Sequence, residues 1–381
     1  MKITRVETFM VPPRWLFVRI ETDSGITGWG EPGLEGFAEI TRTAVEHLAE
    51  YLIGQDPLQI ERHWQVMSKA GMYRGGPVFM TAVAGIDQAL WDIAGKDAGL
   101  PVYQMLGGPV RDRVRMYGWV GGDEPAELAD AISEQVEAGF TAVKMNASGK
   151  MRLSPTIDDI DGVAQRLSAA REALGPHRDV AVDFHGRFTT AGSIRALQVM
   201  EEWHPLFAEE PLLPEHTHRV RDIVQQTSIP IALGERLHSR HEFLSPLESG
   251  ISVVQPDLSH AGGITEVRKI AALAETFDVQ IAPHCPLGPL AVASCLTIGF
   301  TSQNHLIQEM SLGIHYNEGL ELYEYLEDPS DLKINNGYIE KFTKPGLGVA
   351  INEKAVREAD KKGHKWRAPV WYHDDGAFQE W

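Results

Sequence analysis

The feature that most constrains this chain is a carboxylate that recurs at a fixed interval, each time directly after an apolar run. The three acids are Asp183, Glu209 and Glu235, and 26 residues separate each from the next. That interval accommodates a strand, a loop, a helix and a return loop, which is the repeating unit of a parallel βα barrel. We therefore expect a modified TIM barrel whose mouth, at the C-terminal strand ends, brings the three carboxylates together.

Three carboxylates at one mouth form a set of hard oxygen donors. A single acid after a strand is as readily explained as a helix N-cap. Mg²⁺ prefers oxygen ligands and keeps positions open for water or substrate. Because all three acids follow β-like runs in the same period, we predict that Asp183, Glu209 and Glu235 bind one Mg²⁺ per subunit.

Residues 113–320 are expected to form the barrel, because strand-like and helix-like segments alternate there. Side chains on a strand alternate between its faces, so Asp183 and His185 should share one face of the third strand. The eight expected strands lie near residues 115–119, 142–146, 180–185, 206–210, 230–235, 251–256, 279–284 and 305–310.

Residues 1–112 are expected to form an α+β capping domain. Residues 16–31 alternate apolar and polar side chains on either side of a turn at Asp23-Ser24-Gly25, which predicts antiparallel strands. Helical runs follow near residues 35–53, 57–70 and 77–97. The Gly-rich loop before the third run contains Tyr73 and Arg74, and it is either a plain connector or a lid that closes over substrate.

Residues 321–381 lack the barrel alternation and are expected to pack back on the cap. Asn335-Asn336-Gly337 predicts a hairpin turn. Exposed aromatic clusters are unusual, so we expect the aromatic end to lie in a core or in a subunit interface of a homo-oligomer. Its aromatic residues are Trp366, Trp371, Tyr372, Phe378 and Trp381.

The remaining expected strand ends also carry polar groups. Lys144 and Asn146 share a face at the end of the second strand. A lysine at a strand end is usually solvated, and a lone histidine such as His284 is usually structural. At the mouth of a barrel, where active sites lie, a functional role is favoured for both. Asp257, on the neighbouring strand, can fix the tautomer of His284 and raise its basicity, which predicts a general base. Glu309 ends the last strand. The other histidines, His204, His216, His218 and His238, lack such neighbours and are expected at the surface.

The charge balance limits the partners of the chain. Its formal net charge of −18 argues against nucleic acid or an anionic membrane, since either calls for a basic face. An anionic substrate needs a local positive site, which a metal would supply. Cys285 and Cys295 give no disulfide framework. No stretch reaches the ~18 apolar residues of a membrane span. We expect a cytoplasmic protein.

This order of elements and strand-end groups resembles the enolase superfamily, mandelate racemase subgroup, which is known for a Lys or His base working with Mg²⁺. The likeness runs over nearly the whole chain, including the loop 73–77. It is carried by Asp183-Phe184-His185-Gly186-Arg187, by the run Gln255–Glu266, by Ala282-Pro283-His284-Cys285-Pro286-Leu287-Gly288-Pro289 and by Gly313-Ile314-His315-Tyr316-Asn317.

The resemblance implies a role for each strand-end residue. The three carboxylates would hold Mg²⁺, and His284, paired with Asp257, would take the C2 proton of a sugar acid. His185 would protonate the departing 3-hydroxyl, and Glu309 would hydrogen-bond the developing enediolate. These roles amount to a β-elimination that gives a 2-keto-3-deoxy acid.

One position departs from the racemase pattern of the subgroup. After Lys144, the second lysine of the Lys-x-Lys motif is replaced by Asn146. A racemase needs that second base, so its loss favours elimination. Asn146, Tyr73 and Arg74 are the expected substrate contacts, and Lys144 is expected to act in catalysis.

The substrate implied by the resemblance is D-galactonate. The same chemistry on a gluconate, arabinonate or mannonate type of aldonate remains an alternative, because the cap loops and not the barrel motifs select the substrate. A barrel that binds a sugar acid without turnover is the other alternative, and the intact set of acid, base and ligands counts against it.

Overall fold

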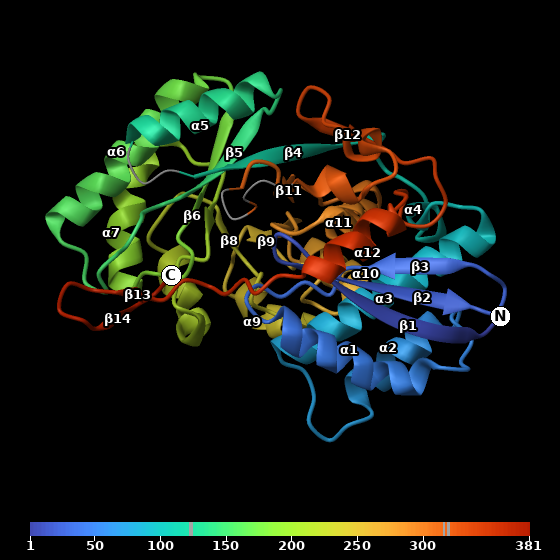
Figure 1. Ribbon diagram of the computed structural model, residues 1–381. Coiled ribbons are helices and arrows are strands. Elements are labelled where there is room, and N and C mark those ends of the chain that lie inside the picture. Colours follow the sequence, from blue (N-terminus) through green and yellow to red (C-terminus); the bar gives the residue numbers. More distant parts are fainter. Residues whose placement is uncertain (122–124, 315–316, 318–320) are drawn as a thin grey trace.

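A curled ring of parallel strands stands at the centre of the fold (Figure 1). The computed structural model describes residues 1–121, 125–314, 317 and 321–381. The ring strands are β4 (Arg113–Val120), β5 (Ala142–Asn146), β6 (Asp179–Asp183), β7 (Ala208–Glu209), β8 (Ile231–Leu233), β9 (Val253–Val254), β10 (Gln280–Ile281) and β11 (Gln308–Met310). They neighbour one another in the order β10-β9-β8-β7-β6-β5-β4-β11. A parallel bridge between Ile281 and His305 brings the segment before β11 back to β10, and the predicted barrel is confirmed.

A cluster of eight buried apolar side chains lies within the ring, and each strand or its flank supplies one of them. Two of the eight are large aromatic residues, Tyr117 and Phe207, whose rings meet edge to face with centroids 6.4 Å apart. The others are smaller, which leaves room for the two rings. The cluster consists of Tyr117, Ala142, Ala181, Phe207, Ala232, Val253, Ala282 and Ile307.

Helices connect successive strands. Thr156 begins the second of them with a capping box: its side chain accepts from Asp159 N, and the Asp159 carboxylate accepts from Thr156 N. The connecting helices are α5 (Pro125–Glu137), α6 (Ile157–Leu174), α7 (Thr190–Met200), α8 (Val220–Val224), α9 (Arg240–Glu248), α10 (Gly263–Glu275) and α11 (Pro289–Thr301). A short strand, β12 (Tyr338–Glu340), pairs antiparallel with β4, after a turn in which Asn335 and Tyr338 exchange backbone hydrogen bonds.

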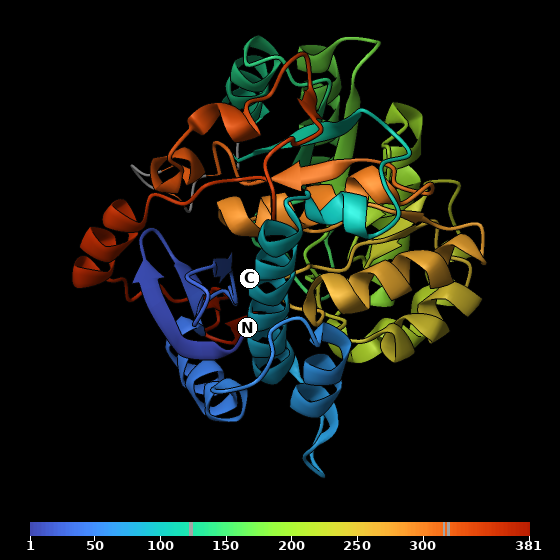
Figure 2. The ribbon, with the colours of Figure 1, turned by 90° about the vertical axis from the view of Figure 1, so that its right-hand side faces the viewer.

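The N-terminal region packs a three-stranded antiparallel sheet against helices. Its elements are β1 (Ile3–Val11), β2 (Trp15–Thr22), β3 (Thr27–Gly30), α1 (Ala38–Leu52), α2 (Ile60–Lys69), α3 (Pro77–Ala98) and α4 (Val102–Met105). Figure 2 shows α3 running between this sheet and α10. A side chain on Gly28 or Gly30 would overlap the carbonyls of Ala89 and Gly85, so these glycines let α3 lie directly on β3.

Buried polar side chains join the N-terminal region to the barrel. Asp87 accepts a hydrogen bond from Thr265 N at 2.9 Å, at the start of α10. Glu31 accepts from Gly288 N and Ala291 N at the start of α11, at 2.7 and 3.0 Å. Burial raises the pKa of Glu31 to about 8, partly offset by these two donors. The two regions are thus fixed against each other through the ends of barrel helices.

The C-terminal segment crosses the molecule. It comprises α12 (Glu353–Lys362), β13 (Trp371–Tyr372) and β14 (Phe378–Gln379). In Figure 1 it leaves α12 beside β1 and reaches the β13–β14 hairpin near the N-terminal end of α7, where Trp371 contacts Arg187. Tyr372 and Phe378 are 57% and 62% exposed, so the aromatic end does not lie in one core. Its place in a subunit interface stays a prediction.

One sequence prediction needs correction, and two others fall outside the described residues. β6 ends at Asp183, and His185 adopts a left-handed backbone conformation with φ of 54°. The expected alternation of strand faces therefore does not reach His185, and that prediction is wrong. His315, Tyr316 and the expected barrel boundary at residue 320 lie outside the described residues. Within the described residues, no helix is long and apolar enough to cross a membrane.

Candidate active site

A cavity of about 450 Å³ opens at the C-terminal ends of the ring strands. Its walls come from three parts of the chain. The barrel supplies polar strand ends, the N-terminal region supplies Arg14 and Glu35, and the C-terminal segment supplies Trp381. The predicted residues on the wall are Lys144, Asp183, His185, Glu235, His284 and Glu309. Sites for small molecules commonly have roughly 300–1,000 Å³ and a few convergent polar groups.

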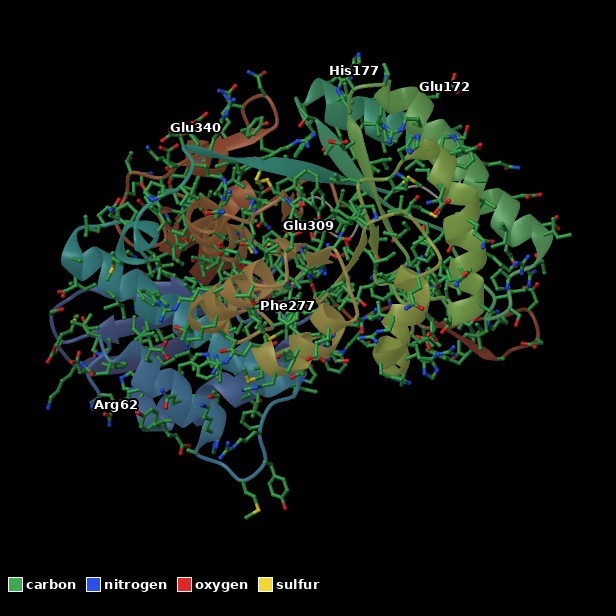
Figure 3. All side chains as sticks on the ribbon, turned by 180° about the vertical axis from the view of Figure 1, so that it is seen from behind. Arg62, Glu172, His177, Phe277, Glu309 and Glu340 are labelled. Atoms are coloured by element: carbon green, nitrogen blue, oxygen red, sulfur yellow. The ribbon has the colours of Figure 1, made fainter. Side chains whose placement is uncertain are left out.

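Lys144 is a buried cation that joins two carboxylates. Its Nζ lies 2.7 and 2.9 Å from the two carboxylate oxygens of Glu209 and 2.8 Å from Oε1 of Glu309. Burial lowers the pKa of Lys144, but Glu209 and Glu309 raise it well above its usual range. Lys144 therefore stays charged. Glu309, in the middle of the molecule in Figure 3, also accepts from Cys285 N at 2.7 Å.

The three predicted ligands lie at the ends of the adjacent strands β6, β7 and β8. All are largely buried, and Asp183 pairs directly with Glu209 in the ladder. Burial, and after it the like charge of Asp183, raises the pKa of Glu209 to about 8. Burial likewise raises the pKa of Glu235 to about 6; His284 opposes this, and the like charge of Asp183 adds to it.

In this arrangement each carboxylate is turned toward a cationic or donor neighbour. Glu209 is held by Lys144 and by Gln255 Nε2 at 2.8 Å. Glu235 Oε2 lies 3.1 Å from Nε2 of His284. Asp183, Glu209 and Glu235 therefore do not converge on one point here. Among the described residues, the acid and histidine side chains whose ligand atoms all lie within 4.8 Å of one another are Asp257, His260 and His284.

The donor set of Asp183, Glu209 and Glu235 nevertheless fits a hard divalent cation. All three are oxygen donors, and buried like charges raise the pKa values of two of them, which a bound cation reverses. Glu210 is a different case, because it is already engaged by Arg236 Nη2 at 2.6 Å and by Gly234 N at 2.9 Å.

The predicted base and its partner are in contact. His284 Nδ1 lies 2.9 Å from Oδ2 of Asp257, and the other oxygen of Asp257 accepts from Ser259 N at 2.6 Å. A carboxylate can only accept, so Nδ1 carries a proton whether or not the ring is charged, and Nε2, which faces Glu235 Oε2, is the nitrogen that gains and loses the second proton. Burial lowers the pKa of His284, but Glu235, Glu309 and Asp257 together raise it well above its usual range.

Asp257→Asn is expected to lower the turnover rate by about 10² or more while Mg²⁺ still binds. The new amide would donate to Nδ1 of His284 and force the proton onto Nε2, where it blocks the base. The check is kcat measured beside the Mg²⁺ affinity. An unchanged rate, or a loss of rate that follows a loss of Mg²⁺, would remove Asp257 from this role.

His185 reaches the cavity from the turn after β6. Its backbone N donates to Oδ1 of Asp183 at 2.6 Å, and its Nδ1 lies 2.9 Å from the carbonyl oxygen of Trp381. Burial lowers the pKa of the imidazole to about 4; Asp183 opposes this, and the guanidinium of Arg187 adds to it.

The structure adds residues to the site that sequence reasoning missed. Glu35 Oε2 lies 3.2 Å from Nε2 of His260 and Glu35 Oε1 lies 3.7 Å from Arg14. Burial lowers the pKa of His260, but Asp257 and Glu35 raise it to about 9. His260 belongs to the run 255–266, whereas no local pattern marks Arg14 or Glu35. His238 also lines the cavity, so its expected surface position is wrong.

Other predicted positions do not line this cavity. Tyr73 is 95% exposed, and Tyr73 and Arg74 border a separate hollow against α1 and α2. Asn146 is half-buried at the end of β5, and its carbonyl accepts from Arg166 at 3.3 Å. His204, His216 and His218 are exposed, as expected.

Family models match both halves of the chain. Residues 6–107 match the mandelate racemase / muconate lactonizing enzyme N-terminal domain, and residues 127–355 match the enolase C-terminal domain-like family. The chain therefore belongs to the mandelate racemase / muconate lactonizing enzyme family of the enolase superfamily, and the predicted resemblance is confirmed.

Individual relatives are similar over the full length. Two curated proteins named D-galactonate dehydratase, from Verminephrobacter eiseniae and Pectobacterium atrosepticum, are 52% and 49% identical, each with 100% of both chains covered. The predicted hydro-lyase class is thereby confirmed. A crystal structure of an enolase from Agrobacterium radiobacter, bound to Na and L-malate, is 32% identical, with a TM-score of 0.92 and 100% of both chains covered.

Proposed function

We propose that this protein dehydrates D-galactonate to 2-dehydro-3-deoxy-D-galactonate with Mg²⁺ as its cofactor. The observation that carries the proposal is a pair of imidazoles on one cavity, His284 backed by a carboxylate and His185 backed by a carbonyl. They follow β10 and β6, and three strands separate these in the ring. An acid and a base on different sides of one mouth suit an elimination.

The substrate assignment is supported by likeness to proteins of stated substrate. The two full-length relatives carry the name D-galactonate dehydratase, and the ligand of the Agrobacterium structure, L-malate, is a 2-hydroxy acid like the proposed substrate. Arg14, Lys144 and Arg236 supply positive charge at the cavity of a chain whose formal net charge is −18. An aldonate can bind there despite the overall acidity of the protein.

The reaction assigns one proton to each histidine. His284 takes the proton from C2, and its electron pair passes into the enediolate. That pair then forms the C2–C3 double bond as the C3–O bond breaks, and the imidazolium form of His185 gives its Nε2 proton to the leaving hydroxide, which departs as water. The resulting enol tautomerises to the 2-keto-3-deoxy acid. Lys144 adds fixed positive charge beside the enediolate, and we assign to Glu309 a hydrogen bond with the same group.

Asp183, Glu209 and Glu235 are the residues that would hold Mg²⁺. When bound, the cation supplies Lewis-acid stabilisation of the negative charge that develops on the substrate carboxylate. Each kind of residue thus has its own role, because the carboxylates hold the cation, the imidazoles move protons, and the N-terminal loops recognise the far end of the substrate.

Incubation with D-galactonate and Mg²⁺ tests the proposal, with a 2-keto acid as the expected product. A parallel panel of gluconate, arabinonate and mannonate should be turned over more slowly, by kcat/KM. Faster turnover of one of these would keep the chemistry and change the substrate. Tight binding of every aldonate without product would identify the non-catalytic alternative.

A further inference from the structure

The C-terminal segment contacts His185 through Trp381, a residue that has no role in the proposed reaction. The carbonyl oxygen of Trp381 lies 2.9 Å from Nδ1 of His185. Its ring meets the imidazole edge on, with centroids 5.4 Å apart and an angle of 84° between planes. Trp381 also lines the cavity. A residue 196 positions away along the chain therefore touches the side chain that we assign as the acid.

His185 needs such a contact because the barrel does not orient it. With φ of 54° it lies beyond the last residue of β6, so the strand no longer dictates where its side chain points. Its backbone is tied to Asp183, which leaves the ring free to turn about its side-chain bonds. The contacts of the imidazole itself therefore decide which nitrogen faces the cavity.

Two neighbours of Nδ1 differ in chemistry. Arg187 Nη2 lies at 3.4 Å and can only donate, whereas the Trp381 carbonyl at 2.9 Å can only accept. The guanidinium is also occupied elsewhere, since its Nη1 donates to Ser148 O at 2.7 Å. The shorter contact keeps a proton on Nδ1, so in the acid form of the ring, which carries a proton on each nitrogen, the Nε2 proton is the one presented to the substrate.

The C-terminal segment is built to hold this carbonyl in place. Gln379, 4% exposed, donates from Nε2 to the carbonyl of Met151 at 3.1 Å. The guanidinium carbon of Arg187 lies over the ring of Trp371, 4.9 Å from the ring centroid. Trp366 packs on Trp381 with centroids 6.1 Å apart. These contacts anchor the segment that ends in the carbonyl.

We propose that Trp381 is a positioning residue for His185. Its carbonyl accepts the Nδ1 proton and directs Nε2 into the cavity, and its indole keeps the carbonyl at that place. The inference rests on the proposed function, because it matters only where His185 acts as the acid. It separates the two halves of the reaction: hydroxide departure depends on Trp381, and proton abstraction by His284 does not.

Trp381→Ala and Trp381→Phe test this inference. Phe378→Ala is the control, since Phe378 lies on the hairpin that precedes Trp381 and is 62% exposed. Two rates are compared for each variant: dehydration of D-galactonate, and exchange of the C2 proton of 3-deoxygalactonate in D₂O. Trp381→Ala should lower kcat for dehydration by about 10²-fold, with exchange and KM changed less than about threefold. Trp381→Phe should recover most of the dehydration, and Phe378→Ala should match wild type.

Equal loss of dehydration and exchange in Trp381→Ala would overturn the inference, because a general disturbance of the site produces that pattern. Unchanged dehydration would overturn it too. A ¹⁵N spectrum of labelled histidines, assigned by comparison with His185→Asn, gives a readout without turnover: the Nδ1-protonated signal of His185 should weaken in Trp381→Ala. If wild type itself fails to dehydrate the aldonate, the proposed function fails, while the ¹⁵N comparison still decides the contact.

Discussion

His284→Asn is expected to abolish dehydration of D-galactonate and also exchange of the C2 proton. Nε2 of His284 is the basic nitrogen at the cavity, because Nδ1 donates to Asp257. Asparagine retains a similar size but cannot accept a proton at neutral pH. General acid or base groups contribute about 10²–10⁴-fold to a rate, so both rates should fall by at least that factor.

His185→Asn is the matched variant, and it should separate the two rates. It removes the acid, so dehydration should again fall by about 10²–10⁴-fold. An analogue without the 3-hydroxyl has no leaving group to protonate, and His185→Asn should exchange its C2 proton in D₂O at a rate close to wild type. Deuterium incorporation followed by NMR measures this directly.

The reverse pattern, with exchange surviving loss of His284 and vanishing with His185, would mean that acid and base are assigned the wrong way round. Exchange in both variants would point to another base. Lys144 is poorly suited to that part, because Glu209 and Glu309 hold its pKa well above the usual range against the effect of burial.

Removal of divalent cations is expected to abolish turnover, and added Mg²⁺ should restore it. Asp183, Glu209 and Glu235 are buried at adjacent strand ends, where burial and like charge raise the pKa of Glu209 to about 8. A cation in their midst would offset that repulsion. Turnover after dialysis against a chelator, with a calorimetric titration of Mg²⁺, provides the measurement. Full activity in a metal-free sample would contradict the ligand assignment.

Glu209→Gln and Glu210→Gln form a matched pair for the same assignment. Changes to groups that only support metal ligands alter affinity by roughly 10- to 100-fold. Glu209→Gln should weaken Mg²⁺ binding by at least that much. Glu210 is already satisfied by Arg236 and Gly234, so Glu210→Gln should bind Mg²⁺ nearly as wild type does. The opposite ranking would make Glu210 the ligand.

The barrel and the acids at its mouth could be predicted because they leave a local signal. Asp183, Glu209 and Glu235 each follow an apolar run at one interval, and parallel strand ends necessarily meet at one edge. The pairing of Asp257 with His284 followed from neighbouring strands. Period and adjacency are properties of the sequence itself, so no tertiary information was needed.

The rest of the site depends on packing between distant segments. Arg14 and Glu35 reach the cavity from N-terminal loops, and Trp381 reaches it from the other end of the chain. None of the three lies in a periodic pattern that predicts its partner. His238 was expected at the surface, but it lines the cavity together with His260, and its own sequence neighbours do not indicate that place.

The cluster of side chains inside the ring has a consequence for redesign of the enzyme. Tyr117 and Phe207 pack with alanine, valine and isoleucine side chains in a buried cluster inside the ring, so larger side chains there are expected to strain the barrel. Glu35 and Phe37, by contrast, belong to the N-terminal wall of the cavity. Libraries that vary this wall can be screened for activity on other sugar acids, because the catalytic groups at the strand ends keep their positions. Libraries that vary the buried cluster around Tyr117 and Phe207 would shift the strand ends, and so change catalysis and substrate binding together.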